Sequence, residues 1–319
     1  MRKSKVFWLT LVCVAFAVSN AWAQEKFPSR PIEMIVNFGP GGGADQLGRI
    51  AAKLLEPALG VAVPVSNVAG ASGNTGLAKV TSAQPDGYTI GTMTGISISS
   101  WAAGMGRLTV NDFAYIGVVQ SSPSMLFVVS DSPFRNYQQL LDHAKANPDK
   151  IKVATAGFGT LDDFAVKFLV TKGYPMVNAA YAKPGERYTS VLGKHTDVLF
   201  EEPGDVVQFL VAKQLRPIVV FGSRRHPEFP DVPASAEFGH DIDLPNWRAI
   251  VTSPKVPGER LAVLSAALGK IMGTDDWKKF CAETYTCIPA MNPAESKKFV
   301  QKNFDDAVNF LKESGTKIR

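Results

Sequence analysis

Motifs of well-known enzyme and metal chemistry are missing from this sequence of 319 residues. It contains no P-loop GKS/T, HExxH, GxSxG or CxxC pattern. Its four histidines, at positions 143, 195, 226 and 240, lack the spacing of metal ligands. Cysteine is scarce too, with three residues in the chain. We therefore expect no catalysis, no metal and no cofactor.

Long apolar runs are absent except near the start, where residues 6–18 are almost wholly apolar. This run of 13 residues is shorter than the about 18 that a membrane span needs. It follows three positive charges and precedes Ala21-Trp22-Ala23, which is the pattern of a secretory signal peptide. We expect cleavage after Ala23 and a periplasmic mature chain. An uncleaved anchor is the alternative.

The excess of positive charge is largely confined to residues 1–23, which carry three positive and no negative charges. Their removal lowers the formal net charge from +5 to +2. A nearly neutral chain has no general electrostatic attraction to nucleic acid, so we expect no such partner. The chain is 45% hydrophobic and 20% charged, as in globular proteins with a large core. Its length predicts one large or two medium domains.

Two cysteines remain after the predicted cleavage, Cys281 and Cys287. Because exported proteins meet an oxidising compartment, we expect a disulfide between them. Two buried free thiols are the alternative.

One local pattern occurs twice. In the first copy, residues 32–38 are rich in β-branched residues and predict a buried strand, which 39–43, with four glycines, interrupt. Apolar residues then recur at helical spacing from 47 to 58, and Gly60 ends the helix. The second copy has a strand at 151–155, a glycine loop at 156–160 and a helix that ends at Gly173. Further expected strands are 88–93, 198–200, 215–221 and 247–251, and further expected helices are 258–272, 277–283 and 293–314.

A glycine loop before a helix is suited to anion binding. The first N–H groups of a helix have no partner within the helix, and the positive end of its dipole lies there. Two such ends facing each other across a cleft would hold a carboxylate or phosphate without Lys or Arg. The alternative is a pair of ordinary strand-to-helix turns, with Asp45 or Thr160 as N-caps.

Several short motifs together resemble the Bug family, the TctC-type periplasmic solute receptors of tripartite tricarboxylate transporters. The motifs are Pro40-Gly41-Gly42-Gly43-Ala44-Asp45, Gly70-Ala71-Ser72-Gly73-Asn74, Pro85-Asp86-Gly87-Tyr88-Thr89, Asp231-Val232-Pro233 and Asn292-Pro293-Ala294-Glu295. The similarity runs from about Phe27 to the C-terminus.

The resemblance implies an α/β, two-lobed periplasmic binding protein of type II-like architecture. Each lobe would be a mostly parallel sheet flanked by helices, with a cleft between the lobes. We expect domain 1 to be discontinuous, with residues 24–125 and 246–319, and domain 2 to contain 126–245.

The resemblance also implies the function. Such a receptor binds a small organic acid, closes by hinge motion and delivers the ligand to a membrane permease of one large and one small subunit. We expect a monomer. In the family, the loops that match 38–45 and 155–160 hold a ligand carboxylate through backbone groups and waters, and the loop that matches 70–74 lines the same cleft. The candidate ligand-binding residues are Phe38, Gly41, Gly42, Gly43, Asp45, Ala71, Ser72, Asn74, Thr155, Phe158, Gly159, Thr160, Asp163, Tyr181, Arg187 and Glu201.

This chain departs from the family pattern at positions that are expected to determine which ligand binds. Many members have His at the position of Asp163, and a Pro-Tyr-Lys-Gly run where this chain has 180–183. Phe158 and Tyr181 are candidate cleft walls. Asp45, Asp163 and Glu201 would bring negative charge to the cleft, which suits a ligand amine or hydroxyl better than a second carboxylate.

Arg187 has two alternative roles. Its planar guanidinium would suit a distal carboxylate of the ligand. A salt bridge with Glu201 or Glu202 is the other reading.

Two other functions stay open. Residues 39–44 fit the loose GxGxxA fingerprint of an exported Rossmann-type oxidoreductase, although Pro40 lies inside it and the next acid, Glu56, lies within the helix. A ligand-loaded sensor that docks on a receptor kinase is the second.

Overall fold

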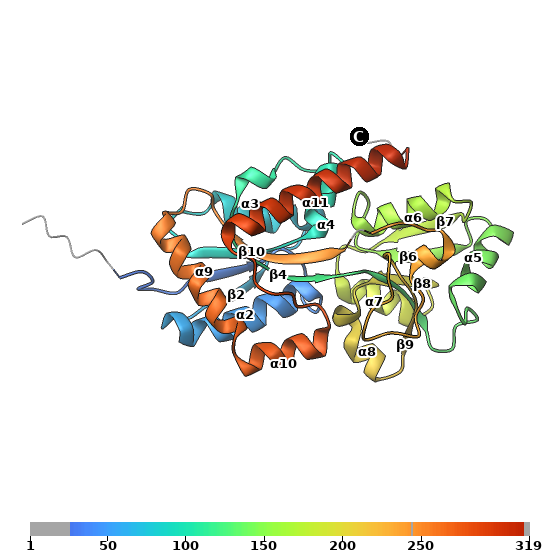
Figure 1. Cartoon of the computed structure of the whole chain (residues 1–319), viewed down its shortest axis with the longest axis horizontal. Coiled ribbons are helices and arrows are strands. Elements are labelled where there is room, and N and C mark those ends of the chain that lie inside the picture. The colour runs from blue at the N-terminus through green and yellow to red at the C-terminus, as the bar shows by residue number, and fades with distance from the viewer. Residues whose placement is uncertain (1–25, 244, 316–319) are drawn as a thin grey trace, which may run out of the picture.

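The computed structural model describes residues 26–243 and 245–315. The predicted signal peptide and its cleavage site lie outside these ranges. Among the described residues, no helix combines the length and apolarity needed to cross a membrane. The described chain forms two lobes side by side, each built on its own five-stranded sheet (Figure 1).

Lobe 1 holds the first sheet, in which β1 pairs in parallel with β2 and β3, while β10 runs antiparallel to β3 and β4. In spatial order the strands are β2 (Val65–Asn67), β1 (Glu33–Val36), β3 (Thr89–Thr94), β10 (Asn246–Thr252) and β4 (Ala114–Ser122).

Lobe 2 holds the second sheet, in which β6 pairs in parallel with β7 and β8, while β5 runs antiparallel to β8 and β9. In spatial order the strands are β7 (Met176–Ala180), β6 (Ile151–Thr155), β8 (Val198–Glu201), β5 (Met125–Val129) and β9 (Leu215–Val220).

The two sheets have the same pattern of strand directions, and the expected two-lobed α/β fold is confirmed. Each sheet is mixed: four of its five strands run in one direction, and the strand that enters from the other lobe, β10 or β5, runs against its neighbours. These strands begin at Met125 and Asn246, next to the predicted domain boundaries, which stay predictions.

Helices cover both sheets, and their apolar faces form the cores. In α2, the residues at 47, 51, 54 and 55 are buried against β1, as the helical spacing predicts. The helices of lobe 1 are α2 (Gly43–Leu59), α3 (Asn74–Ser82), α4 (Gly95–Ala102), α9 (Gly258–Met272), α10 (Asp275–Thr284) and α11 (Pro293–Glu313). Those of lobe 2 are α5 (Tyr137–Ala146), α6 (Leu161–Thr171), α7 (Pro184–Leu192) and α8 (Val207–Val211). Both lobes also contain short 3-10 turns: η1 (Ala71–Gly73) and η2 (Val110–Asp112) in lobe 1, and η3 (Pro203–Val206) and η4 (Ser235–Phe238) in lobe 2.

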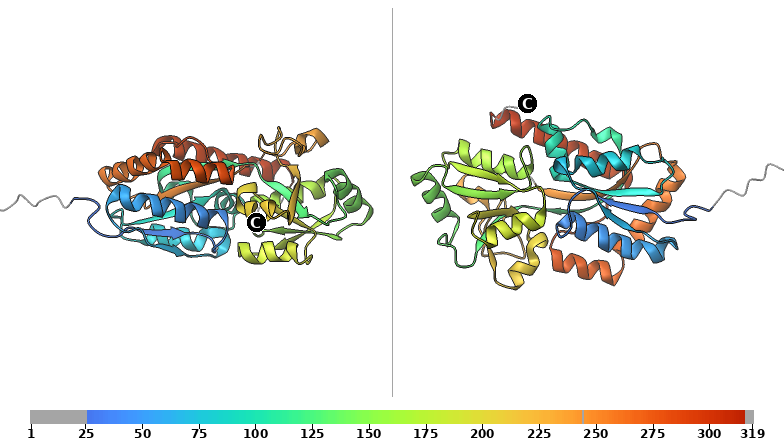
Figure 2. Two further views of the ribbon diagram at one scale, coloured as in Figure 1. Left: turned by 90° about the horizontal axis from the view of Figure 1, so that it is seen from below. Right: turned by 180° about the vertical axis from the view of Figure 1, so that it is seen from behind.

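The last helix, α11, contacts both lobes. It packs along α4 and β4 of lobe 1, and Ser296 Oγ accepts a hydrogen bond from the Val118 N–H. Its C-terminal end reaches lobe 2, where the Phe310 ring lies 6.0 Å from that of Phe164 and 5.9 Å from that of Phe168, centroid to centroid. Figure 2 shows this bridging position from two further sides. The last helix therefore packs on lobe 1 and also supports lobe 2 through its C-terminal end.

Candidate ligand-binding cleft

A small cavity of about 20 Å³ lies where the two lobes meet. It is lined by Phe38, Gly42, Gly43, Ala44, Thr94 and Ile96 of lobe 1, by Ala156, Pro184, Arg187, Glu201 and Asp205 of lobe 2, and by Asn246 and Arg248 of β10. A cavity of this size has room for about one water molecule. The lobes are therefore nearly closed on each other.

Glycines permit this close approach. A Cβ atom on Gly42 would lie 2.7 Å from Pro184 Cγ across the cleft, closer than real Cβ atoms come to a neighbour. A Cβ on Gly157, in the loop after β6, would lie 3.6 Å from Ser72 Oγ of lobe 1. The glycine loops of the two lobes therefore line opposite sides of one cleft, as the sequence pattern predicts.

The N-terminus of α2 holds a carboxylate from the other lobe. Its N-cap, Gly42, has no side chain to cap the helix. The Gly43 N–H instead donates to Asp205 Oδ2 at 3.0 Å, and Arg248 Nη2 donates to the same oxygen at 2.7 Å. Because helix ends and guanidinium groups both favour anions, this is a built carboxylate position.

The equivalent end of α6 is arranged differently. Thr160 is its N-cap, and the Thr160 hydroxyl accepts a hydrogen bond from the Asp163 N–H at 3.4 Å. This is the capping alternative that the sequence left open. Asp162 lies buried beneath the loop and accepts the Ala156 N–H at 2.7 Å. Of the two helices that follow the glycine loops, α2 therefore has no side-chain cap at its N-terminus, whereas α6 has one.

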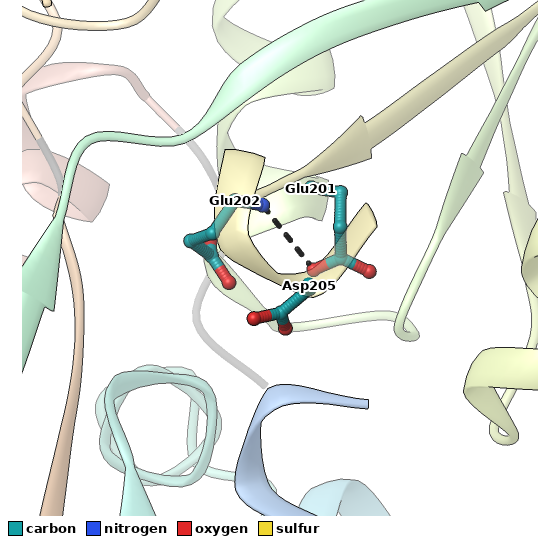
Figure 3. A group of neighbouring side chains, drawn as sticks. All are labelled: Glu201, Glu202 and Asp205. Carbon is teal, nitrogen blue, oxygen red and sulfur yellow. Dashed lines mark hydrogen bonds between the residues drawn. The ribbon is translucent and has the colours of Figure 1, made fainter. Parts of the chain in front are cut away.

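Ionisable side chains are concentrated around the cavity. Arg187 donates through Nε and Nη2 to Glu201 Oε2, and Arg248 pairs with both Glu202 and Asp205. The salt-bridge alternative for Arg187 is thus the one that the structure shows. Figure 3 shows the Glu201, Glu202 and Asp205 carboxylates side by side, at and just after the end of β8.

Burial shifts the proton affinity of these carboxyl groups. It raises the pKa of Asp162 and of Asp205 to about 6, although Arg187 and Arg248 respectively act in the opposite direction. Burial, together with the nearby charges of Glu201 and Asp205, raises the pKa of Glu202 well above its ordinary value. The cleft therefore resists additional negative charge.

The three acids at the end of β8 are close enough together to raise the question of a cation site. Oxygen atoms of Glu201, Glu202 and Asp205 all lie within 4.8 Å of one another. Each carboxylate, however, already accepts a guanidinium, from Arg187 in the first case and from Arg248 in the other two. A cation would have to displace these arginines, so the geometry favours an ion-pair network over a metal centre.

Asp45 acts on its own loop. Its Oδ2 accepts the Gly41 N–H and Arg49 Nε, both at 3.0 Å, and its Oδ1 accepts Asn67 Nδ2 at 2.9 Å. Burial raises the pKa of Asp45, but these hydrogen bonds outweigh burial and hold the pKa below its ordinary value. Asp45 does not line the cavity. The geometry assigns it to shaping the loop rather than to touching a ligand.

Asp163 repeats this arrangement in lobe 2. Its Oδ2 accepts the Gly159 N–H and pairs with Lys167 Nζ, and its Oδ1 accepts Asn178 Nδ2, each at 2.8 Å. The two lobes share the same set of contacts. In each, the aspartate accepts the N–H of the glycine four residues before it, pairs with the base four residues after it, and accepts the side-chain amide of an asparagine on the adjacent parallel strand. We call this set of contacts the aspartate clamp.

The remaining candidate residues fall into three groups. Phe38, Gly42, Gly43, Arg187 and Glu201 line the cavity, while Gly41, Thr155, Gly159 and Thr160 belong to the loops beside it. Asn74 donates to the Ala71 carbonyl at 2.6 Å, which holds the turn that carries Ser72.

The two candidate aromatic walls do not line the cavity. Phe158 is 57% exposed. Tyr181 accepts the Ser190 hydroxyl at 2.8 Å and borders an adjoining open hollow of about 580 Å³, together with Pro40 and Lys183. Loop 156–160 points the Phe158 ring to solvent in this closed arrangement, and the role of both rings as walls around the ligand stays a prediction.

Four residues at or beside the cavity were not predicted from the sequence, namely Asp162, Asp205, Asn246 and Arg248. Glu202 was expected only as a possible partner of Arg187. One signal was present, since Arg248 interrupts the otherwise apolar run at 247–251, and a charge in a buried strand needs a buried partner. The acids from 201 to 205 directly follow a strand, which was a second signal.

A larger hollow of about 570 Å³ lies on the other side of the lobe junction. Ser99 of α4, Leu161 of α6, Trp247 of β10 and Phe310 of α11 are among its lining residues. None of the glycine loops borders it, so we do not assign the ligand there.

The comparisons with known proteins agree with this geometry. Residues 47–316 match the model of the tripartite tricarboxylate transporter family receptor, TctC. The chain belongs to this family. The predicted family is thus confirmed, and membership in a family of solute receptors argues against the oxidoreductase alternative. Relatives of similar sequence include the UPF0065 protein in the tcbD-tcbE intergenic region of Pseudomonas sp. strain P51, which is 29% identical over 272 residues, 83% of this chain and 81% of the relative.

Solved structures show the same fold. The periplasmic binding protein BugD superposes with a TM-score of 0.84 at 25% identity, over 91% of this chain and 99% of that one. MatC from Rhodopseudomonas palustris, solved with bound malate, superposes with a TM-score of 0.80 at 21% identity, over 89% of this chain and 100% of that one. The second likeness concerns the fold alone.

Proposed function

We propose that this chain is a periplasmic receptor that binds a small organic acid in the cleft between its lobes. Its ligand would pass to a tripartite transporter through a permease of one large and one small subunit. The observation that supports this most is the α2 end, where Gly43 N–H and Arg248 already hold the Asp205 carboxylate. A ligand carboxylate would take the same position. The malate bound to MatC is in keeping with this class of ligand.

Ligand entry requires the lobes to separate, because about 20 Å³ cannot contain an organic acid. The contacts that would part are those of Gly42 with Pro184 and of Asp205 with Gly43 and Arg248. Residues 123–124 and the longer segment before β10 join the lobes and would form the hinge. Export with cleavage after Ala23 and a monomeric state belong to the same proposal.

A thermal-shift screen of mono-, di- and tricarboxylates tests the proposal. A bound acid at 100 times its Kd stabilises the folded protein by about 2.7 kcal/mol and raises the melting temperature. A complete lack of response to carboxylates would count against the receptor assignment.

The Gly43→Ala variant tests whether the ligand carboxylate binds at the N-terminus of α2. Alanine suits the first turn of α2, but its Cβ would collide with Asp205 and Arg248, where the ligand carboxylate is placed. We expect at least a tenfold loss of affinity in protein whose circular dichroism spectrum is native. Gly269→Ala, where a Cβ meets nothing within 4 Å, is the matched control and should bind normally. Unchanged affinity in Gly43→Ala would move the site elsewhere.

Delivery to a transporter is tested separately from binding. The purified receptor, with and without its acid, is used to capture partners from membranes. Recovery of a large and a small permease subunit supports the transporter, and recovery of a receptor kinase supports the sensor alternative instead.

A further inference from the structure

The buried ionisable cluster at the cavity holds more acids than bases. Arg187, Glu201, Asp205 and Arg248 line the cavity itself. Asp162 and Glu202 bond to other lining residues, and all six side chains are at most 5% exposed. Four carboxyl groups thus face two guanidinium groups. Among the described residues around this cavity, no further base supplies the missing positive charge.

Three polar atoms on residues that line the cavity have no hydrogen-bond partner, namely Asn246 Oδ1, the Thr94 hydroxyl and Arg248 Nε. Asn246 is 3% exposed, and its Nδ2 donates to Glu202 Oε2 at 2.8 Å while its Oδ1 accepts nothing. The Thr94 hydroxyl, 2% exposed, is likewise unpartnered. Both residues line the cavity. A buried acceptor beside a carboxylate is a position that requires a donor, and a protonated amine supplies several.

The occupied α2 end makes a plain carboxylate a poor ligand for this chain. To reach Gly43 N–H and Arg248, the ligand carboxylate must displace Asp205, which would then be buried without its donors. It would also add a negative charge to a cluster that already has an excess. A buried unpaired carboxylate is strongly unfavourable, so the displaced Asp205 needs a new cationic partner.

We infer that the ligand is an amino carboxylate. Its carboxylate takes the place of Asp205 at Gly43 N–H and Arg248, and its ammonium group lies among Asp205, Glu202 and Asn246 Oδ1. This inference rests on the proposed function, because it assumes a carboxylate at the α2 end. It goes further in making Glu202 and Asp205 the residues that select for the amine.

Matched ligand pairs test the inference by calorimetry at pH 7.5. Alanine is compared with lactate, aspartate with malate, and 4-aminobutyrate with 4-hydroxybutyrate, since the members of each pair differ only in ammonium against hydroxyl. We expect the amino member of a binding pair to have at least a tenfold lower Kd. Equal or tighter binding of the hydroxy acids would overturn the inference and leave the proposed function intact. If no carboxylate of any kind binds, the proposed function itself fails.

The variant Asp205→Asn gives a sharper test. It weakens the internal competitor at the α2 end by removing its charge, and it removes one negative charge near the ammonium. The hydroxy acid should therefore gain affinity while the amino acid loses it, so that their ratio falls at least tenfold. Glu202→Gln keeps an acceptor for Asn246 and should reduce the ratio in the same direction, which preserves the test if the first variant does not fold.

The control is Asp131→Asn, an exposed carboxylate of lobe 2 that pairs with Lys194 away from the cleft. It should leave the ratio unchanged. A ratio unaffected by either cleft variant, in protein with a native circular dichroism spectrum, would refute the assignment. So would 1-aminopropane binding as tightly as 4-aminobutyrate, because that result would make the carboxylate irrelevant.

Discussion

Asp162 is predicted to weaken the fold at neutral pH, and its replacement by asparagine should remove that cost. The side chain is 4% exposed beneath the loop after β6, where burial raises its pKa from 3.8 to about 6. The Ala156 N–H that donates to its carboxylate would find an amide oxygen at the same place in Asp162→Asn. The substitution thus removes the charge while keeping the hydrogen bond.

The sign and size follow from proton linkage. Because the folded-state pKa is the higher one, Asp162 contributes its full stability below about pH 3.8 and loses it as the pH rises through about 6. The difference between 3.8 and 6 corresponds to about 3 kcal/mol, at about 1.4 kcal/mol for each tenfold change in proton affinity. Between pH 4.0 and 7.5, the unfolding free energy of Asp162→Asn should therefore rise by about 2 to 3 kcal/mol relative to the parent protein.

Urea unfolding at both pH values, followed by circular dichroism, measures this double difference, in which the titration of all other groups cancels. Asp131→Asn is the control of opposite sign. Lys194 holds the pKa of Asp131 below its ordinary value, so that group contributes stability above about pH 3.8 and loses it as the pH falls. The explanation based on a buried carboxylate is wrong if the unfolding free energy of Asp162→Asn, relative to the parent, does not change between the two pH values. It is also wrong if that difference changes in the same direction as for Asp131→Asn.

Three further substitutions follow from the packing. Replacing Cys281 and Cys287 by serine opens the disulfide that the structure contains and should cost about 2 kcal/mol, given the short loop; urea unfolding of the parent with reductant should reproduce the loss. Phe310→Ala should lower the unfolding free energy by about 2 kcal/mol, which is less than for a fully buried ring because Phe310 is only half-buried. An unchanged urea midpoint would mean that α11 does not support lobe 2. Asp45→Ala should lower the unfolding free energy by about 2 kcal/mol because it leaves loop donors unpaired. Arg49→Ala should lower it by under about 1 kcal/mol. Equal losses would contradict the role of Asp45 in the aspartate clamp.

The long periodic elements could be predicted from sequence because their signals are local. The helix expected at 258–272 is α9 with the same bounds, and the one expected at 293–314 is α11 to within one residue. The strand expected at 247–251 is β10. Its antiparallel direction could not be predicted, since a strand pattern carries no information about the direction of its neighbours.

The chemistry of the cleft was only partly visible, because its decisive contacts join distant segments. Asp205 meets the Gly43 N–H across 162 residues, and its place just after a strand could not identify that partner. The glycine loops were found because a helix end needs only local residues. Arg187 was placed near the cleft correctly, but only the fold shows that Glu201 is its partner.

The aspartate clamp, present in both lobes, has a consequence for how affinity arises. Each clamp ties its glycine loop to a helix and a neighbouring strand through side chains that face away from the cavity. The loop backbones are therefore ordered before a ligand arrives, and little conformational entropy is lost on binding. The residues that face the cavity are a different set. Substitutions among them can exchange one ligand for another while the two loops keep their shape.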